Sequence, residues 1–479
     1  MKKLPSLKMP KRYLAGFMAV SLLALLSTAL VSCDTSSVEV VIPDPDPDPD
    51  PLPPGNFRPY MKRGVAYNFL FPRSNPVPRA DMELLSPGVR WFYNWAMSVP
   101  AQVETLAAEH DLVFIPQRWS ASGWGAGGFD SVLNNLRGFV ERNPETRWIM
   151  AYNEPMLTNE ANLTPAQAAA DWPNILRIAD ELDLKVLSPA LTFGNIGTRE
   201  GNTAWNSPDG WFDAFLEQPG VYLEDIDIVR IHTYIAWMSA VSGYINRFRK
   251  YDRPIWVTEF AAWGNPVVPT DEEWQMRFMS EAVMYFELEP LIEKYFWFIP
   301  KGGGDYYPPD NLRPPFNKLL TQASPTQLTR LGVVYVNMPH VNINRKTWVP
   351  LGRRMTAAHI TNATTVAAPT NRMVHFRPST DTAYDSEILD IHRFATESWI
   401  EFQARVPASG SRTLSLRNMA PESTVLDIHA NGVLVATANL AQSGEWRTTE
   451  VPLELAEGDY TIRLSVRSGN CAINWLRLD

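Results

Sequence analysis

The chain has 479 residues, of which 45% are hydrophobic, and a formal net charge of −9 at neutral pH. This length is too great for a single hydrophobic core, so we expect two folded units. The acidic balance repels nucleic acid, which argues against a nucleic-acid partner and favours an uncharged one.

The first 32 residues have the pattern of an export signal. Five basic residues precede an apolar run from about residue 13 to residue 31, and this run ends in Leu30-Val31-Ser32-Cys33. The pattern resembles a bacterial lipoprotein signal, whose chemistry acylates the cysteine and cleaves the chain just before it. The alternative is a single membrane-spanning helix, since about 19 apolar residues could just cross a bilayer.

We therefore expect residues 1–32 to be removed and Cys33 to carry lipid. The protein would be an exported bacterial lipoprotein, anchored to a membrane at the outer membrane, the cell surface or in the periplasm. Its mature charge would be −9 − 5 = −14, and Cys471 would be left without a disulfide partner. Residues 33–56 form a Pro/Asp-rich linker, which we interpret as an extended tether because proline and like charges alternate from Pro43 to Pro51.

Residues 57–339 alternate between short apolar segments and helical or loop stretches. This alternation predicts an α/β fold in which parallel strands are covered by helices, a (β/α)8 TIM barrel. Capping boxes at Thr164–Gln167 and Thr270–Glu273 predict helices after the fourth and seventh strands. The predicted strands are 64–69, 88–92, 112–115, 148–152, 185–187, 226–231, 254–257 and 295–298.

Two glutamates stand where predicted strands end. Glu154 follows the fourth strand and Glu259 follows the seventh, and their separation of 259 − 154 = 105 residues corresponds to three β/α units of about 35 residues. Glycoside hydrolysis needs two such carboxyl groups, because one protonates the departing sugar oxygen while the other attacks the anomeric carbon or activates water. The alternative is a surface glutamate on each loop.

Other candidate residues lie beyond the strand ends. His232 and Tyr234 follow the sixth strand and could orient the nucleophile or a sugar hydroxyl, although His232 could also be a core histidine. No metal ligand set, phosphate-binding loop or dinucleotide motif is found, so we expect no metal and no cofactor. Flat aromatic rings stack on sugars, and for any single tryptophan the alternative is ordinary burial; the candidates for a glycan groove are Trp119, Trp124, Trp237, Trp263 and Trp297.

Several of these motifs occur in the order of a known family. Residues 60–338 resemble glycoside hydrolase family 128, the endo-β-1,3-glucanases of clan A. The resemblance implies that Glu154 is the acid/base, that Glu259 is the nucleophile, and that Asn153 binds the hydroxyl beside the reacting carbon. It departs from the family at Met156, where aspartate is frequent. It rests on Gly64-Val65, Tyr152-Asn153-Glu154-Pro155, Ser188-Pro189-Ala190, His232-Thr233-Tyr234, Thr258-Glu259-Phe260-Ala261 and Leu328-Thr329-Arg330-Leu331-Gly332.

Residues 352–479, after a linker at 340–351, show short alternating runs and an Asn431-Gly432 hairpin signal, which predict an all-β, jelly-roll-like sandwich. This domain resembles carbohydrate-binding module family 6, and the resemblance implies that Trp446 and Asn474 contact sugar. Calcium is not expected, because the family's early glutamate is absent near residues 357–359. The alternative is a spacer sandwich. The motifs are Ser398-Trp399-Ile400-Glu401-Phe402, Gly444-Glu445-Trp446, Glu457-Gly458-Asp459-Tyr460 and Ile473-Asn474-Trp475-Leu476.

Together these features predict a monomeric, retaining, endo-acting hydrolase of β-1,3-glucan such as laminarin or curdlan. One alternative is a clan A enzyme on another β-linked glucan, mannan or xylan, because the catalytic pair would look the same. Another is a non-catalytic surface lipoprotein that only binds glycan. The expected partners are a β-glucan and a membrane, and no nucleic acid.

Overall fold

The computed structural model describes residues 61–70, 78–125, 127–192, 207–263, 271–301, 316–342, 348–365, 372–383 and 386–479. The predicted export signal, Cys33 and the Pro/Asp tract lie outside these residues. All described residues belong to one compact unit. Within them, no helix has both the length and the apolar character that crossing a bilayer requires.

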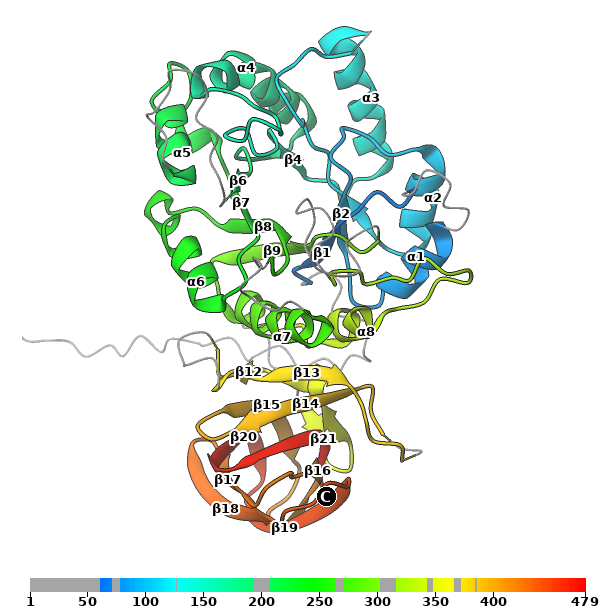
Figure 1. The fold of residues 1–479 in the computed structure, drawn as a ribbon, viewed down its shortest axis with the longest axis vertical. Coiled ribbons are helices and arrows are strands. Elements are labelled where there is room, and N and C mark those ends of the chain that lie inside the picture. The colour runs from blue at the N-terminus through cyan, green and yellow to red at the C-terminus, as the bar shows by residue number, and fades with distance from the viewer. Residues whose placement is uncertain are drawn as a thin grey trace, which may run out of the picture. The chain divides into compact units, whose positions relative to one another are not determined.

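Residues 61–342 form an α/β region in which every strand pairing is parallel. Figure 1 shows helices lying around the strands. The strands are β1 (Arg63–Ala66), β2 (Trp91–Tyr93), β3 (Val113–Phe114), β4 (Trp148–Met150), β5 (Lys185–Leu187), β6 (Leu191–Thr192), β7 (Val229–Thr233), β8 (Ile255–Phe260) and β9 (Ile292–Trp297). The helices are α1 (Pro78–Leu85), α2 (Ala101–Glu109), α3 (Gly128–Arg142), α4 (Pro165–Leu182), α5 (Pro208–Leu216), α6 (Met238–Asn246), α7 (Glu272–Leu288) and α8 (Arg330–Asn337), with the short 3₁₀ helices η2 (Leu223–Asp225) and η3 (Arg249–Tyr251).

The strands fall into two groups that single bridges connect. One sheet has the order β3-β2-β1-β9-β8-β7-β6, and the second consists of β4 and β5. Gln117, just beyond β3, bridges Met150 of β4, and Leu187 of β5 bridges Ile228, just before β7; both bridges are parallel. This neighbour order is compatible with the eight-stranded arrangement that the sequence predicts, with β5 and β6 in the place of one strand. Because the strands are parallel, their carboxyl ends lie at the same edge.

The predicted strands are found, with boundaries shifted by a few residues. The prediction for 185–187 coincides with β5, whereas 88–92 begins three residues before β2. Of the two predicted capping boxes, the first is confirmed: Thr164 accepts from the Gln167 amide and donates its own amide to the Gln167 side chain. The second is wrong by one residue, because Asp271 caps α7 by accepting from the backbone N–H of Trp274.

A lysine occupies the interior of the α/β region near the amino ends of the strands. The Lys294 ammonium on β9 lies 4.2, 4.4 and 4.6 Å from the ring centres of Trp91, Trp148 and Trp256. These tryptophans stand at or near the first residue of β2, β4 and β8. The aromatic cage and its cation therefore fill the end of the strands opposite to the predicted glutamates.

Residues 348–479 form a β-rich region of two six-stranded sheets. One sheet has the order β10-β15-β20-β17-β18 with β12 beside β15, and the other has β13-β14-β21-β16-β19 with β11 beside β21. Apart from β10 with β15, the pairings are antiparallel. The elements are β10 (Val349–Pro350), β11 (Arg354–Thr356), η4 (Ala357–His359), β12 (Asn362–Ala363), β13 (His375–Pro378), β14 (Leu389–Ala395), β15 (Trp399–Val406), β16 (Gly410–Met419), β17 (Thr424–Ala430), β18 (Val433–Leu440), β19 (Arg447–Leu455), β20 (Gly458–Ser468) and β21 (Asn470–Leu478).

Two details of this region bear on the sequence predictions. The Asn431-Gly432 hairpin is confirmed: it joins the antiparallel strands β17 and β18, and both residues have positive φ, 49° and 82°. β10 lies within the predicted linker 340–351 and pairs with β15, so regular structure begins before residue 352.

The β-rich region contacts α7 through β13. The Ser280 hydroxyl accepts from the Phe376 amide at 3.0 Å, and His375 Nε2 lies 2.8 Å from Glu281 Oε1. Ser280, Glu281 and His375 are all buried. Much of α7 is therefore covered on the side of the β-rich region as well as on the side of the strands.

Candidate active site

Glu154 stands at the carboxyl end of β4 in a tight loop. Its backbone has φ 42°, and its carbonyl accepts from the Leu157 amide at 3.0 Å. The residue is only 7% exposed, and Oε1 lies 2.7 Å from His232 Nδ1. Burial raises the pKa of Glu154 to about 7, against the opposing effects of a Thr192 hydrogen bond and the Arg230 charge. A carboxyl group with this pKa can hold a proton near neutral pH and release it to a leaving group.

Glu259 lies on β8 and is surrounded by hydrogen-bond donors. Tyr93 OH donates to Oε1 at 2.6 Å, Trp95 Nε1 donates to the same oxygen at 2.8 Å, and Tyr234 OH donates to Oε2. Donors of this kind bind a carboxylate more strongly than a neutral acid. These three donors hold the two carboxyl oxygens of Glu259 in a fixed orientation.

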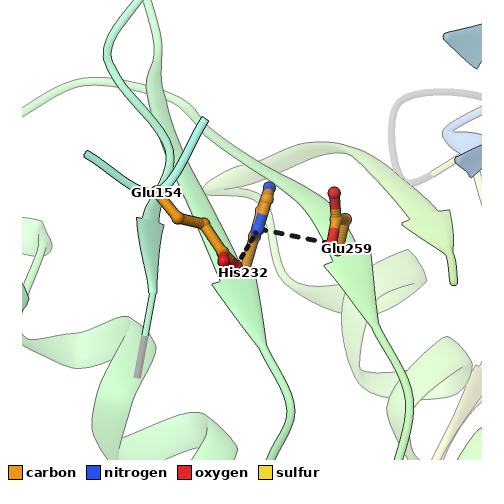
Figure 2. A group of neighbouring side chains, drawn as sticks. All are labelled: Glu154, His232 and Glu259. Carbon is orange, nitrogen blue, oxygen red and sulfur yellow. Dashed lines mark hydrogen bonds and ion pairs between the residues drawn. The ribbon is translucent and has the colours of Figure 1, made fainter. Parts of the chain in front are cut away.

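His232 lies between the two glutamates. Figure 2 shows its ring beside both carboxyl groups, and Nδ1 is 2.7 Å from Glu154 Oε1 and 3.5 Å from Glu259 Oε2. A carboxyl oxygen of Glu154 and one of Glu259 are within 4.8 Å of each other. Burial lowers the pKa of His232 to about 3; the Glu259 charge opposes this shift and the Arg230 charge adds to it. The imidazole is therefore neutral at physiological pH.

Arg230 fixes the position and tautomer of this imidazole. Its guanidinium is fully buried and donates to Thr258 Oγ1 at 2.8 Å and to the Ala151 carbonyl at 3.0 Å. A further guanidinium nitrogen lies 3.5 Å from His232 Nε2. Because a guanidinium only donates, Nε2 must be the acceptor, and the ring proton is on Nδ1, where it points to Glu154.

Asn153 precedes the acid candidate and is buried. Its backbone amide donates to the Trp119 carbonyl at 2.8 Å, and its carbonyl accepts from the Ala161 amide at 3.1 Å. The side chain lies 3.2 Å from Gln117 and 3.2 Å from Glu160. Both termini of the amide thus have neighbours that restrict its rotation.

Two of the predicted groove aromatics lie directly beside this centre. Trp119 is 38% exposed, and its backbone is bonded to Asn153. Trp263 packs edge-on against the Tyr234 ring at 5.5 Å between ring centres. Both residues are thus attached to groups of this centre, and their contact with sugar stays a prediction.

Other predicted aromatic residues are engaged differently. Trp237 is 43% exposed and packs edge-on against Trp274. The Arg118 guanidinium lies 3.8 Å from the ring centre of Trp124, whose Nε1 donates to Asp171. Trp297 is fully buried and donates Nε1–H to the Asn317 carbonyl at 2.7 Å, so this predicted sugar contact is corrected to a core side chain.

Trp446 and Asn474, the two predicted sugar contacts in the β-rich region, differ in their exposure. Trp446 is half-buried and donates Nε1–H to Thr380 Oγ1 at 3.2 Å, which leaves part of its ring exposed. Asn474 is fully buried. Its amide accepts from the Glu387 N–H at 2.8 Å and donates to Asp390 at 2.9 Å and Ser379 at 3.0 Å. The structure therefore gives Asn474 a role in holding loops, in place of the predicted sugar contact.

Several groups that complete the centre are not among the residues predicted from the sequence. Tyr93 and Trp95 come from the end of β2, Arg230 from β7, and Gln117 from the segment after β3. An aromatic residue at the end of the predicted second strand was a possible signal for Tyr93. Arg230 and Gln117 carried none, because their roles depend on partners distant in the sequence.

Glu154, His232 and Glu259 are also the one group among the described residues whose ligand atoms lie close enough to hold a metal ion. Their contacts are accounted for by the hydrogen bonds described above. We assign no metal to them, and the expectation of a metal-free enzyme stays a prediction.

Comparisons with known proteins add the following. The sequence pattern of the family described as glycosyl hydrolase catalytic core matches residues 64–335. Alkali-sensitive linkage protein 1 of Schizosaccharomyces pombe is 25% identical over 248 residues, which cover 50% of this chain but only 39% of that protein. A solved GH128 (subgroup II) endo-β-1,3-glucanase from Pseudomonas viridiflava is 28% identical with a TM-score of 0.48, covering 58% of this chain and 98% of that one. The corresponding enzyme from Sorangium cellulosum is 27% identical with a TM-score of 0.46, covering 58% and 99%.

Proposed function

We propose, from the premise that the chain belongs to the glycosyl hydrolase catalytic core family, that it is a retaining, endo-acting hydrolase of β-1,3-glucan built on a closed (β/α)8 barrel. The observation that carries the proposal is the pair Glu154 and Glu259, with carboxyl oxygens within 4.8 Å of each other. Retaining enzymes hold their carboxyl groups about 5 to 5.5 Å apart, whereas inverting enzymes need about 6.5 to 9.5 Å to admit a water.

In the first step Glu259 attacks the anomeric carbon as the glycosidic bond breaks. Glu154 gives its proton to the departing oxygen, so that the leaving sugar takes that oxygen as a hydroxyl and Glu154 becomes ionised. The product of this step is a glycosyl ester of Glu259. The pKa of Glu154, raised to about 7 by burial, supports its role as the acid.

In the second step water resolves the ester. The water oxygen attacks the anomeric carbon while Glu154, now ionised, takes a proton from that water. The bond between the sugar and Glu259 breaks, and Glu259 leaves as a carboxylate. The neutral His232, whose Nδ1–H points to Glu154, can stabilise the ionised form of Glu154 between the two steps without adding a net charge. Two inversions give net retention of configuration.

The substrate class rests on the motifs that this chain shares with glycoside hydrolase family 128. Asn153 and the glutamate pair occupy one buried centre, as that resemblance implies; the Trp119 backbone bonds to Asn153, and Trp263 packs against Tyr234. Aromatic residues near a catalytic pair are suited to stacking on sugar rings, which supports a glycan substrate.

The experiment that tests the function measures reducing-sugar release from laminarin, curdlan, mixed-linkage glucan, mannan and xylan. We expect cleavage of laminarin and curdlan, and NMR of the first-formed product should show the β anomer. Glu259→Gln should abolish turnover on every substrate, whereas Glu154→Gln should retain first-step activity on aryl glycosides whose leaving group needs no proton. An initial α anomer would overturn the retaining mechanism, and inactivity on all five polymers would overturn the function.

A further inference from the structure

Glu160 is a third carboxyl group beside the catalytic pair. The loop after β4 folds back on itself, because the Ala161 amide donates to the Asn153 carbonyl at 3.1 Å. This turn brings Glu160 Oε2 to 3.2 Å from the side-chain amide of Asn153. Glu160 takes no part in the two chemical steps above.

A chain of amide groups connects Glu160 to Arg230. One terminal atom of the Gln117 side chain lies 3.0 and 3.2 Å from two guanidinium nitrogens of Arg230, and the same atom lies 3.2 Å from a terminal atom of Asn153. An NH₂ group at this position could donate to Asn153, but it would also face two further donors. Since a guanidinium only donates, the Gln117 atom must be the amide oxygen.

The polarity of the remaining contacts follows from this assignment. Asn153 must direct its NH₂ group to the Gln117 oxygen, which turns its own carbonyl oxygen toward Glu160. An ionised carboxylate offers only acceptors, so the 3.2 Å contact between Asn153 and Glu160 is a hydrogen bond only if Glu160 carries a proton. We infer that Glu160 is a protonated carboxylic acid that donates to Asn153 and thereby fixes the amide orientation of this residue.

The surroundings support this protonation state. Gln117 and Arg230 are fully buried and Asn153 is 4% exposed, so the Asn153 side chain has little access to water and a mismatched pair of acceptors there is costly. Burial raises the pKa of Glu160 to about 7, and the charges of Glu154 and Glu259 act in the same direction. Arg230, the facing cation, is separated from Glu160 by the two amides, and His232 is neutral.

Glu160 is therefore a positioning residue for substrate binding, a consequence that rests on the proposed function. When Glu160 ionises, Asn153 either loses this hydrogen bond or turns its amide by half a rotation. Either change alters whether Asn153 presents an acceptor or a donor to the sugar hydroxyl that it is expected to bind. Affinity for substrate should consequently weaken as the pH rises through the pKa of Glu160.

The first test does not depend on activity. NMR of the full-length protein, isotopically labelled at glutamate Cδ, follows each carboxyl group through a pH titration, and Glu160→Gln identifies the signal of Glu160. We expect this signal to titrate near pH 7. In Gln117→Met, the chain of amide groups no longer connects Arg230 to Asn153, so Asn153 can turn its NH₂ group to the Glu160 carboxylate. The pKa of Glu160 should then fall by at least about one unit. A value unchanged in Gln117→Met, or a wild-type value near pH 4, overturns the inference.

The second test measures KM and kcat between about pH 6 and pH 8.5 on soluble laminarin oligosaccharides. Glu160→Gln keeps a donor for Asn153 at every pH, so its KM should stay level while the wild-type KM rises about ten-fold, as expected for one lost hydrogen bond. Glu160→Ala should have a raised KM already at the lower pH. Glu224→Gln, an exposed glutamate, is the matched control and should behave as wild type.

The outcomes separate the two proposals. A Glu160→Gln enzyme with the wild-type pH dependence of KM would show that Glu160 does not position Asn153. If no polymer is cleaved, the proposed function fails, and the NMR titration still decides the protonation of Glu160.

Discussion

Tyr93 is a single residue through which the role of Glu259, the proposed nucleophile, can be tested. Its hydroxyl donates to Glu259 at 2.6 Å, and Tyr93→Phe removes this donor while keeping the ring. A hydrogen bond to a charged group contributes about 1.5–3 kcal/mol, so we expect kcat/KM to fall about 10- to 100-fold. Tyr222→Phe, at a tyrosine that is 61% exposed, is the control and should leave kcat/KM unchanged. Equal kinetics for the two variants would contradict the role of Tyr93.

Thr192 offers a way to move the pKa of the acid. A side-chain hydrogen bond from Thr192 lowers the pKa of Glu154, which burial raises to about 7. Glu154 must be protonated to act, so kcat/KM falls as the pH rises through this pKa, and Thr192→Val should shift the fall to higher pH. The pH–rate profile is best measured in the Glu160→Gln background, where the titration of Glu160 is absent. If the fall in kcat/KM shifted to lower pH instead, a group other than Glu154 would control the loss of activity at high pH.

At the residue scale, the sequence indicates the two candidate glutamates but not the groups that surround them. Glu154 and Glu259 stand out because a polar residue ending an apolar strand is visible locally. Arg230 is a charged residue inside an apolar segment, and only the folded chain shows that its guanidinium is buried against His232. Trp297 was wrongly predicted as a sugar contact. Neighbouring residues of a strand point to opposite faces, and the short predicted strand does not show to which face the Trp297 side chain belongs.

At the scale of elements, the aromatic cage around Lys294 is a further feature that can be tested. Burial lowers the pKa of Lys294 from 10.5 to about 8, which corresponds to a cost of about 3 kcal/mol for the buried ammonium. Each indole contact returns about 0.5–1 kcal/mol at exposed sites and about 2 kcal/mol when desolvated. A methionine thioether keeps contacts of about 0.3–1.5 kcal/mol with each of these rings and has no charge to bury. We therefore expect Lys294→Met to raise the free energy of unfolding at pH 7.

The lowered pKa of Lys294 also determines how the stability of the protein changes with pH. The folded protein holds the Lys294 proton less tightly than the unfolded chain, so wild-type stability rises with pH between about 8 and 10.5. The advantage of Lys294→Met should therefore shrink over this interval. Thermal unfolding of both proteins at a series of pH values measures the difference, and a Met variant that is less stable at pH 7 would show that the cage outweighs the burial of charge.

The pattern of elements was largely predictable, whereas their ends were not. A buried parallel strand is continuously apolar, so the short apolar segments between helical stretches identify the parallel strands. β6 was missed, since Leu191 and Thr192 follow Pro189 and form a strand only by pairing with β7. The start of α7 was misplaced by one residue because Thr270 and Asp271 are both good helix caps.

For the molecule as a whole, we expect the β-rich region to bind polysaccharide through Trp446. β13 packs on α7, so a point substitution in the full chain is a cleaner test than deletion. Trp446→Ala should weaken retention on insoluble β-1,3-glucan and slow its hydrolysis about ten-fold, while cleavage of short soluble oligosaccharides stays near wild type. Val433→Ala, at an exposed apolar residue of the same region, is the control. Unchanged retention of the Trp446 variant on curdlan would exclude this role.

The whole protein is also expected to be anchored by lipid at Cys33. Mass spectrometry of the membrane-extracted protein should show a mature chain that begins at an acylated Cys33, because the basic and apolar start resembles a lipoprotein signal. Cys33→Ser should move the protein out of the membrane fraction. Purified protein that still contains residues 1–32 would rule out this processing.

The hydrogen bond between Tyr93 and Glu259 joins residues 166 positions apart in the chain. The strands that carry them, β2 and β8, are connected in the sheet only through β1 and β9, which come from the two ends of the α/β region. Contacts between residues so far apart in the sequence form slowly, so we expect Tyr93 and Glu259 to meet late in folding. If the proposed function holds, a nascent or partly folded chain would therefore lack the reacting pair, and hydrolysis would begin only in the finished fold.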